Sequence, residues 1–323
     1  MRFAYEIQNE TAKIWRCFDY GEEIEIPGSL EGYPVTELAP YIFSEHMDEE
    51  KLEKRIAAGQ VFLSEGSGAP ALCGSGLKGV HLPPALQKIG AYAFYNCGRL
   101  EVLSFHGGLK DLGPGLFTGC HHVRQLKLTL DHTGTSCLQE ILMELNEELR
   151  LTLCRDGREA RLVFPEFYEE GVENTPARIL MTQMHGSGMH YRNCFYQKRF
   201  DFHAYDNCFF RAKAQEREML VLELAIGRLR FPLGLGEQER AVYESYLMEH
   251  LPEAGQQAVS QRDMELLIWL IREFLSAGDY PGEKELLRRI LGQASEQGFT
   301  EGNAFLLDTL HQRFPSGEER FEF

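Results

Sequence analysis

The sequence predicts an α+β protein: a short solenoid of repeated strands with an N-terminal hairpin cap, followed by an all-α region for which an α-solenoid is one candidate arrangement. Between residues 77 and 128 the apolar positions recur every 23 residues, so that Val80 corresponds to Leu103 and Leu126. Near the N-terminus apolar and polar residues alternate, and from residue 212 apolar residues recur at helical spacing. A fixed period in the twenties is typical of a solenoid whose coils bury their faces against each other.

The composition indicates a folded protein with little affinity for nucleic acid or membranes. The chain has 323 residues, enough for two domains, with 43% hydrophobic and 25% charged residues. A formal net charge of −16 repels phosphate backbones and anionic lipid. Because no apolar run reaches transmembrane length and the N-terminus lacks the apolar core of a signal peptide, we expect a cytoplasmic location. The eight cysteines are then expected to be thiols.

The N-terminal segments predict a cap and a first coil. Residues 3–8 and 12–18 alternate as two strands of a hairpin, which would cover the apolar edge of the solenoid. Residues 23–27 predict a strand that ends in proline, and the coil that follows has an enlarged turn. An insertion at about residues 44–75, with helix formers in its first part, is expected to project from the body.

Two motifs resemble a known family. Gly-Ala-Tyr-Ala-Phe-Tyr-Asn-Cys-Gly-Arg-Leu occupies positions 90–100, and Ile26-Pro27 precedes Gly-Tyr-Pro-Val-Thr at positions 32–36. Together with the repeated strands, these motifs resemble the BspA-like leucine-rich repeat over about residues 1–130. The resemblance implies a curved parallel β-solenoid used for protein recognition, often at cell surfaces. We therefore expect a leucine-rich-repeat domain at 1–136 and a second domain at 137–323.

The repeat also predicts which strand residues point outward. Because side chains alternate along a strand, the residues between the buried positions must face away from the core. The predicted partner-binding residues are Glu23, Glu25, His81, Val102, Ser104, Gln125 and Lys127. Their variety is what a recognition surface needs, and an ordinary solvated sheet surface is the alternative interpretation.

For residues 137–323 the sequence predicts a linker helix, a hairpin and a series of helices. After a polar hinge at 131–136 we expect a helix over 138–149 and a hairpin whose turn is Asp156-Gly157. No structure is predicted for 165–211. The expected helices further on are 212–227, 237–251, 256–261, 264–275, 283–294 and 302–311. This series is loosely similar to ankyrin-like or HEAT-like stacking, although it shows no internal period.

Two sets of residues invite a metal interpretation. The repeat places Cys97 and Cys120 one coil apart, where a free cysteine packs as a small apolar filler. The other set supplies zinc-type ligands but follows no metal motif that we can defend. Its members are His185, His190, Cys194, His203 and Cys208.

The leading functional hypothesis is a non-catalytic scaffold that binds a protein partner through the outward strand face and the helical half. The sequence offers no nucleophile with a base at a motif spacing and no phosphate-binding loop, so we expect neither enzymatic activity nor a cofactor. One alternative is a metal-binding enzyme or sensor that uses the histidine and cysteine set at 185–208. A second alternative is a surface adhesin whose export signal is missing from this sequence.

Overall fold

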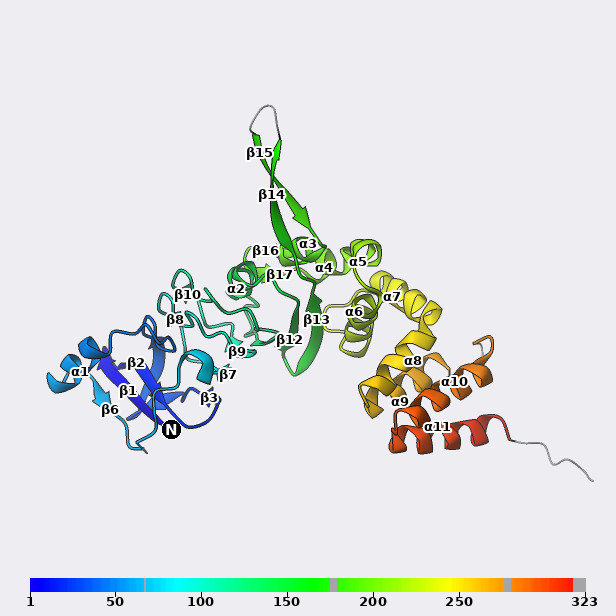
Figure 1. The fold of residues 1–323 in the computed structure, drawn as a ribbon, viewed down its shortest axis with the longest axis horizontal. Coiled ribbons are helices and arrows are strands. Elements are labelled where there is room, and N and C mark those ends of the chain that lie inside the picture. The colour runs from blue at the N-terminus through cyan, green and yellow to red at the C-terminus, as the bar shows by residue number, and fades with distance from the viewer. Residues whose placement is uncertain (67, 175–178, 276–279, 316–323) are drawn as a thin grey trace, which may run out of the picture.

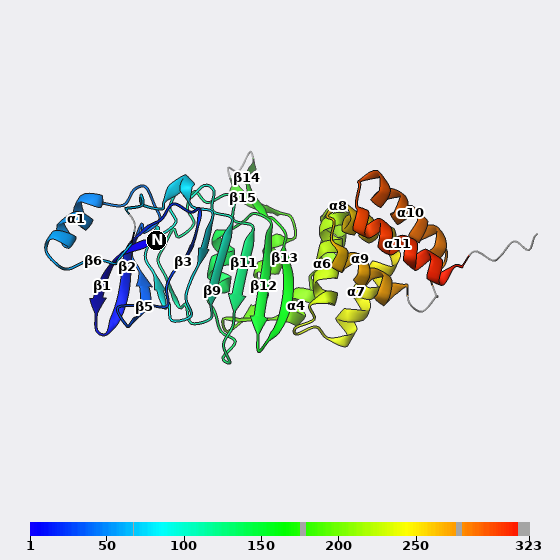
Figure 2. The same cartoon turned by 90° about the horizontal axis from the view of Figure 1, so that it is seen from below.

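A computed structural model describes residues 1–66, 68–174, 179–275 and 280–315. Figure 1 shows an arched molecule in which the N-terminal strands and the last helices lie lower than the central strands. Figure 2, seen from below, shows a sheet that faces the viewer along the underside of the arch, with the C-terminal helices grouped at one end. The chain is thus an α+β protein, and its C-terminal region is mostly helical.

The sheet on the underside, called the inner sheet, carries the repeat. In spatial order its strands are β13 (Arg158–Phe164), β12 (Leu149–Arg155), β11 (Gln125–Thr129), β9 (Val102–His106), β7 (Gly79–His81) and β3 (Glu23–Glu25). Strands β3 to β11 are parallel, and Val80 pairs with Leu103, which pairs with Leu126. These residues are buried, as the 23-residue period predicted.

The ladder of parallel strands continues past residue 136, where we expected the repeat domain to end. Strand β12 pairs in parallel with β11, with Leu151 beside Leu126, although their separation is no longer 23 residues. The predicted hairpin at Asp156-Gly157 joins β12 to the antiparallel strand β13. The inner sheet therefore has two more strands than the repeat revealed.

A second sheet lies behind the inner sheet. Its strands, in spatial order, are β10 (Asp111–Leu112), β8 (Lys88–Ile89), β5 (Tyr33–Leu38), β2 (Thr11–Phe18), β1 (Arg2–Gln8) and β6 (Phe62–Leu63), with β4 (Ser29–Leu30) paired to β5. Strands β1 and β2 form the predicted N-terminal hairpin. The insertion does not project freely as we expected, because β6 pairs with β1 and Leu52 of helix α1 (Glu49–Ala57) packs with Ala4 and Val61.

Stacked side chains fill the space between the two sheets. The rings of Phe43, Phe94 and Phe117 stack with centroids 5.3 and 5.4 Å apart. The Cys97 thiol donates to the Phe43 carbonyl oxygen at 3.1 Å, and the Cys120 thiol donates to the Phe94 carbonyl oxygen at 3.0 Å. Burial raises the pKa of both thiols, which suits the packing role predicted for them.

The C-terminal region begins on the last coil. Helix α2 (Leu138–Glu144) is shorter than the predicted 138–149, and its Glu144 carboxylate accepts a hydrogen bond from the Phe117 N–H at 3.1 Å. Residues 165–211, for which no secondary structure was predicted, contain a two-stranded ribbon that stands out from the body (Figure 1). The elements of this part are β14 (Tyr168–Asn174), β15 (Ile179–His185), α3 (Gly188–Arg192), β16 (Phe195–Tyr196), β17 (Arg199–Phe200), α4 (Phe202–Asn207) and α5 (Phe209–Gln215).

The helical series follows the predicted order, with shifted boundaries. The remaining helices are α6 (Glu218–Arg230), α7 (Glu237–Glu249), α8 (Leu251–Ser260), α9 (Met264–Phe274), α10 (Glu283–Glu296) and α11 (Thr300–Arg313). Asp263 is the N-cap of helix α9, and its carboxylate accepts a hydrogen bond from the Leu266 N–H at 2.8 Å. Helix α8 begins before the predicted residue 256, with proline in its first turn. Within the described ranges, no helix has the length and apolar character needed to cross a membrane.

Candidate functional site

The outward residues of the inner sheet form two rows across the strands. The strand register aligns the first row as Glu23, Gly79, Val102, Gln125, Arg150 and Val163. It aligns the second row as Glu25, His81, Ser104, Lys127, Thr152 and Arg161. All seven predicted face residues belong to these rows, and β12 and β13 add four residues that the repeat period could not indicate.

A polar chain crosses the N-terminal side of these rows. His81 Nδ1 lies 3.0 Å from Ser104 Oγ, and His81 Nε2 lies 3.7 Å from Glu23 Oε2. The Glu23 side chain folds over Gly79, where an added Cβ would lie 2.8 Å from Glu23 Cγ. Glycine at position 79 therefore leaves the space that Glu23 uses to approach the imidazole.

Serine, imidazole and carboxylate are also the groups of nucleophilic catalysis. Such chemistry needs hydrogen-bond donors, from the backbone or from side chains, aimed at the oxyanion that forms beside the nucleophile. The backbone N–H groups of parallel strands instead point within the plane of the sheet, and the Leu82 N–H pairs with the Ser104 carbonyl oxygen at 2.8 Å. Glu23 Oε2, at 3.7 Å from His81 Nε2, is also too distant for the carboxylate–histidine hydrogen bond of a catalytic triad.

Lys127 is the exposed cation at the middle of the second row. Within the described residues its ammonium group has no hydrogen bond or ion pair. Its charge reaches His106, whose pKa is lowered from the ordinary value of 6.5, first by burial and then by Lys127. The ammonium group of Lys127 is therefore available to interact with a molecule bound on the outward face of the sheet.

Replacing Lys127 by methionine is expected to raise the pKa of His106. The ammonium group disfavours the protonated imidazole, so its removal lets His106 bind a proton at higher pH, while burial keeps part of the depression. A titration of the histidine ring signals by NMR measures this shift, with Lys51→Met as the control. An unchanged or lower His106 pKa in Lys127→Met would contradict the placement of Lys127.

A groove of about 450 Å³ separates the inner sheet from the helices, and we call it the sheet–helix groove. On the sheet side it is lined by His81, Val102, Ser104, Gln125 and Lys127, with Arg150, Thr152 and Arg161. On the helical side it is lined by Glu223, Ile226, Arg230, Gln257, Gln261 and Leu266. Glu25 lines a second hollow of about 730 Å³, which shares His81, Ser104 and Lys127 with the groove. Thus five of the seven predicted residues border one groove, and Glu23 and Glu25 lie at the far edge of the sheet.

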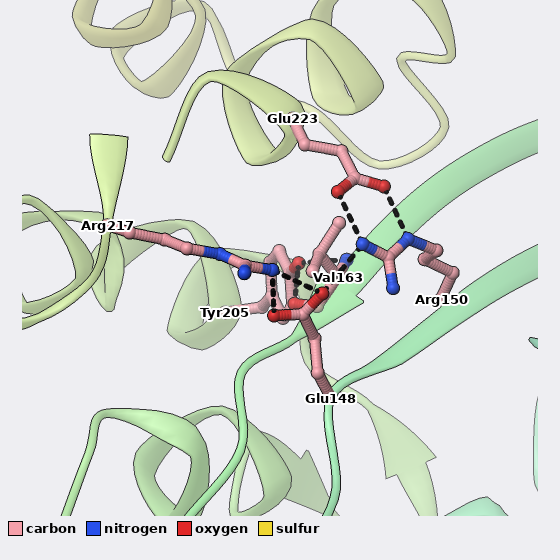
Figure 3. Close-up of polar contacts among 6 residues, drawn as sticks. All are labelled: Glu148, Arg150, Val163, Tyr205, Arg217 and Glu223. Atoms are coloured by element: carbon pink, nitrogen blue, oxygen red, sulfur yellow. Dashed lines mark hydrogen bonds and ion pairs between the residues drawn. The ribbon is translucent and has the colours of Figure 1, made fainter. Parts of the chain in front are cut away.

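Ion pairs hold helix α6 beside the inner sheet (Figure 3). Arg150 Nε and Nη2 contact Glu223 Oε1 and Oε2 at 2.7 and 2.8 Å, a bidentate pair between β12 and α6. Glu148 completes the network, with Arg150 Nη2 at 2.7 Å and Arg217 Nη2 at 2.7 Å. The groove wall is therefore tied to its floor by charge-assisted hydrogen bonds.

The edge of β13 is also covered by the helical region. The Tyr205 hydroxyl donates to the Val163 carbonyl oxygen at 2.7 Å and accepts from the Val163 N–H at 2.8 Å. Helix α6 approaches β13 so closely that a Cβ added at Gly227 would lie 2.8 Å from the Arg161 carbonyl oxygen. These contacts give hydrogen-bond partners to backbone groups at the edge of β13, so the helical region packs directly against the last strand of the inner sheet.

The structure brings together two of the five metal candidates. Cys194 Sγ and Cys208 Sγ are 3.8 Å apart, whereas His185 pairs with Glu170 at 3.0 Å and His203 pairs with Glu239 at 2.7 Å. Burial lowers the pKa of His190. Across the residues that the structure describes, no three histidine, cysteine, aspartate or glutamate side chains are grouped so that they could hold a metal ion.

Stacked parallel strands with a repeated buried face are typical of solenoid proteins. Residues 68–147 match the family model of the BspA type Leucine rich repeat region, in 6 copies, and this part of the chain is such a region. No protein with a curated description matches the chain.

Two solved structures are similar to this chain. One is a leucine rich cell surface protein from Faecalibacterium prausnitzii A2-165, with 18% identity, 41% of this chain and 29% of that chain covered, and a TM-score of 0.22. The other is the Leucine Rich Repeat protein of T. pallidum, with 17% identity, 48% of this chain and 80% of that chain covered, and a TM-score of 0.23. This chain therefore spans less than a third of the length of the first protein.

Proposed function

We propose that the protein is a non-catalytic scaffold that binds a protein partner on the outward face of the inner sheet, with the helical region sharing the contact. The single observation that carries the proposal is the sheet–helix groove, which collects His81, Val102, Ser104, Gln125 and Lys127 from three strands. The buried positions of these strands are uniformly apolar, whereas the outward positions vary in charge, size and hydrogen-bonding capacity. Leucine-rich-repeat proteins generally bind other proteins, which supports the same function.

The proposal divides the chain by role. We assign the repeat strands, together with β12 and β13, to the floor of the binding surface and helices α6, α8 and α9 to its wall. The Arg150–Glu223 pair fixes the wall to the floor. Binding is therefore expected to need both parts, so the domain boundary first placed at residue 136 would separate residues of one surface.

The double substitution His81→Glu with Lys127→Glu is expected to abolish capture of the partner from lysate by the immobilised protein. Both side chains are partly or fully exposed, so two carboxylates on the groove floor change the surface charge and leave the melting temperature unchanged. Affinity capture with quantitative mass spectrometry, together with a thermal melt, measures both effects.

The matched control is His311→Glu with Lys51→Glu, which makes the same change in formal charge at exposed positions outside the groove. Capture by this control should equal that of the unmodified protein. If the groove variant captured the same partners as the control, the proposed binding face would be wrong.

A further inference from the structure

Charge is distributed unevenly along the inner sheet. The N-terminal edge carries the exposed carboxylates Glu23 and Glu25, whereas the other end carries cations. The charged side chains that line the sheet–helix groove include the four cations Lys127, Arg150, Arg161 and Arg230 and the two carboxylates Glu223 and Asp263. Cations therefore outnumber carboxylates among the lining residues themselves, in a chain whose net charge is −16.

The four cations differ in how far they are neutralised. Arg150 is held by Glu223 and Glu148, and Arg230 lies within 3.6 Å of Asp263 and 3.4 Å of Glu265. Lys127 has no partner among the described residues. Arg161 is half-exposed, stacks over the Phe231 ring at 3.7 Å and pairs with its neighbour Glu159 at 2.8 Å. Lys127 and Arg161 are therefore the cations most accessible to a bound anion.

The register gives the spacing of these two cations. Lys127 pairs with Thr152, and Thr152 pairs with Arg161, so the two cations lie two strands apart in one row. Two strand spacings correspond to about 10 Å. Carboxylates on alternate residues of an extended peptide lie about 7 Å apart. The Lys127 and Arg161 side chains are long enough to bring their charged groups from the backbone spacing of about 10 Å to this separation. An extended acidic segment can therefore place one carboxylate beside each of the two cations.

The groove also contains an amide without a partner. Gln257 of α8 is only 4% exposed, lines the groove, and its Oε1 has no hydrogen-bond partner among the described residues. A buried polar atom is costly when it has no partner. An amide side chain offers both a donor and an acceptor, which is what a peptide backbone requires. Gln125 and Gln261 place two further amides on the groove walls.

From these observations we propose that the sheet–helix groove binds an extended segment of the partner protein that carries acidic side chains on alternate residues. Lys127 and Arg161 bind the carboxylates, and the Gln257 side chain, whose Oε1 is shielded from solvent in this structure, turns toward the segment and hydrogen-bonds its backbone. Glu23 and Glu25 repel acidic residues from the opposite end of the sheet and so orient the segment. This inference rests on the proposed function, and it adds the chemical class of the bound segment.

The test uses three fluorescein-labelled pools of ten-residue peptides, with glutamate, glutamine or lysine on alternate residues and mixed residues between them. Fluorescence anisotropy with the full chain is expected to show at least tenfold tighter binding of the glutamate pool than of the other two. The double variant Lys127→Met with Arg161→Met should lose at least tenfold in affinity. The matched double variant Lys51→Met with Arg289→Met, at exposed positions on α1 and α10, should bind as the unmodified protein does.

A Gln257→Met variant tests the role of the amide in binding, with the melting temperature as the measure of folding. Methionine has a similar size and removes the unpartnered acceptor, so we expect weaker binding of the glutamate pool, by at least threefold, without a lower melting temperature. Unchanged binding by Gln257→Met would overturn the role given to this amide.

Several outcomes would overturn the inference itself. These are equal binding of the three pools, an equal loss in the matched double variant, or displacement of the glutamate pool by oligothymidylate at the same concentration as by unlabelled peptide. If none of the pools binds while His81→Glu with Lys127→Glu still abolishes partner capture, the acidic segment is wrong and the proposed function stands. If that variant captures normally, the proposed function fails.

Discussion

Replacing Arg192 by methionine is expected to lower the free energy of unfolding by at least about 3 kcal/mol. The Arg192 side chain is fully buried, and burial lowers its pKa to about 10. Its guanidinium group donates only to backbone carbonyl oxygens. The acceptors are those of Leu142 at 3.1 Å, Leu145 at 3.0 Å, Glu147 at 2.6 Å, Gly188 at 3.2 Å and Pro165.

The large effect follows from where these carbonyls lie. Two of them belong to the end of α2, where the last helical turn leaves its carbonyl oxygens without partners, and Pro165 follows β13. One side chain thus joins α2, α3 and the end of the inner sheet. Each buried carbonyl that loses its donor costs roughly 1–3 kcal/mol.

Urea denaturation of Arg192→Met measures this cost. The control is Arg155→Met, because the Arg155 side chain is 42% exposed and its loss should change stability by about 0.5 kcal/mol or less. An Arg192→Met variant as stable as the Arg155→Met variant would show that the buried guanidinium does not hold these segments together.

Replacing Asp206 by alanine is expected to lower the free energy of unfolding by about 3–5 kcal/mol. Asp206 binds Arg228 through two hydrogen bonds of 2.7 and 2.9 Å, and it accepts from the Tyr243 hydroxyl at 2.9 Å. All three side chains are buried between α4, α6 and α7. Without Asp206 the Arg228 guanidinium group would remain charged in the interior without a counterion.

A double substitution distinguishes loss of the ion pair from loss of packing. Asp206→Leu with Arg228→Met replaces both charges by apolar side chains, so it should recover most of the stability that the single variant loses. Urea denaturation of the unmodified protein, Asp206→Leu, Arg228→Met and the double variant gives the coupling free energy. A double variant that is less stable than Asp206→Ala would contradict this explanation.

The sequence was informative wherever stability depends on local periodicity. The positions of Val80, Leu103 and Leu126 predicted the inner sheet because each must fill the same place in successive coils. The period did not predict that β12 joins the inner sheet. Between β11 and β12 the chain forms helix α2, so this coil is longer than 23 residues. The 23-residue spacing is therefore absent between β11 and β12, although apolar residues still alternate over residues 149–153.

The helical wall of the candidate site could not be predicted from the sequence. Arg150 and Glu223 are 73 residues apart, and neither lies in a recognisable motif. His81 and Ser104 are one 23-residue period apart, so the sequence placed them on neighbouring strands, whereas the hydrogen bond between them is seen only in the structure. Five face residues nevertheless border the groove because the alternation of side chains in a strand is a local rule.

The most direct test of the binding surface is photo-crosslinking from defined positions. Benzoylphenylalanine in place of Gln125, on the groove floor, should crosslink the captured partner, whereas the same residue in place of Lys88, on β8 of the second sheet, should not. A third variant in place of Gln261, on the helical side of the groove, should crosslink the same partner as the Gln125 variant. Crosslinking from position 88 without crosslinking from positions 125 and 261 would contradict the proposed surface.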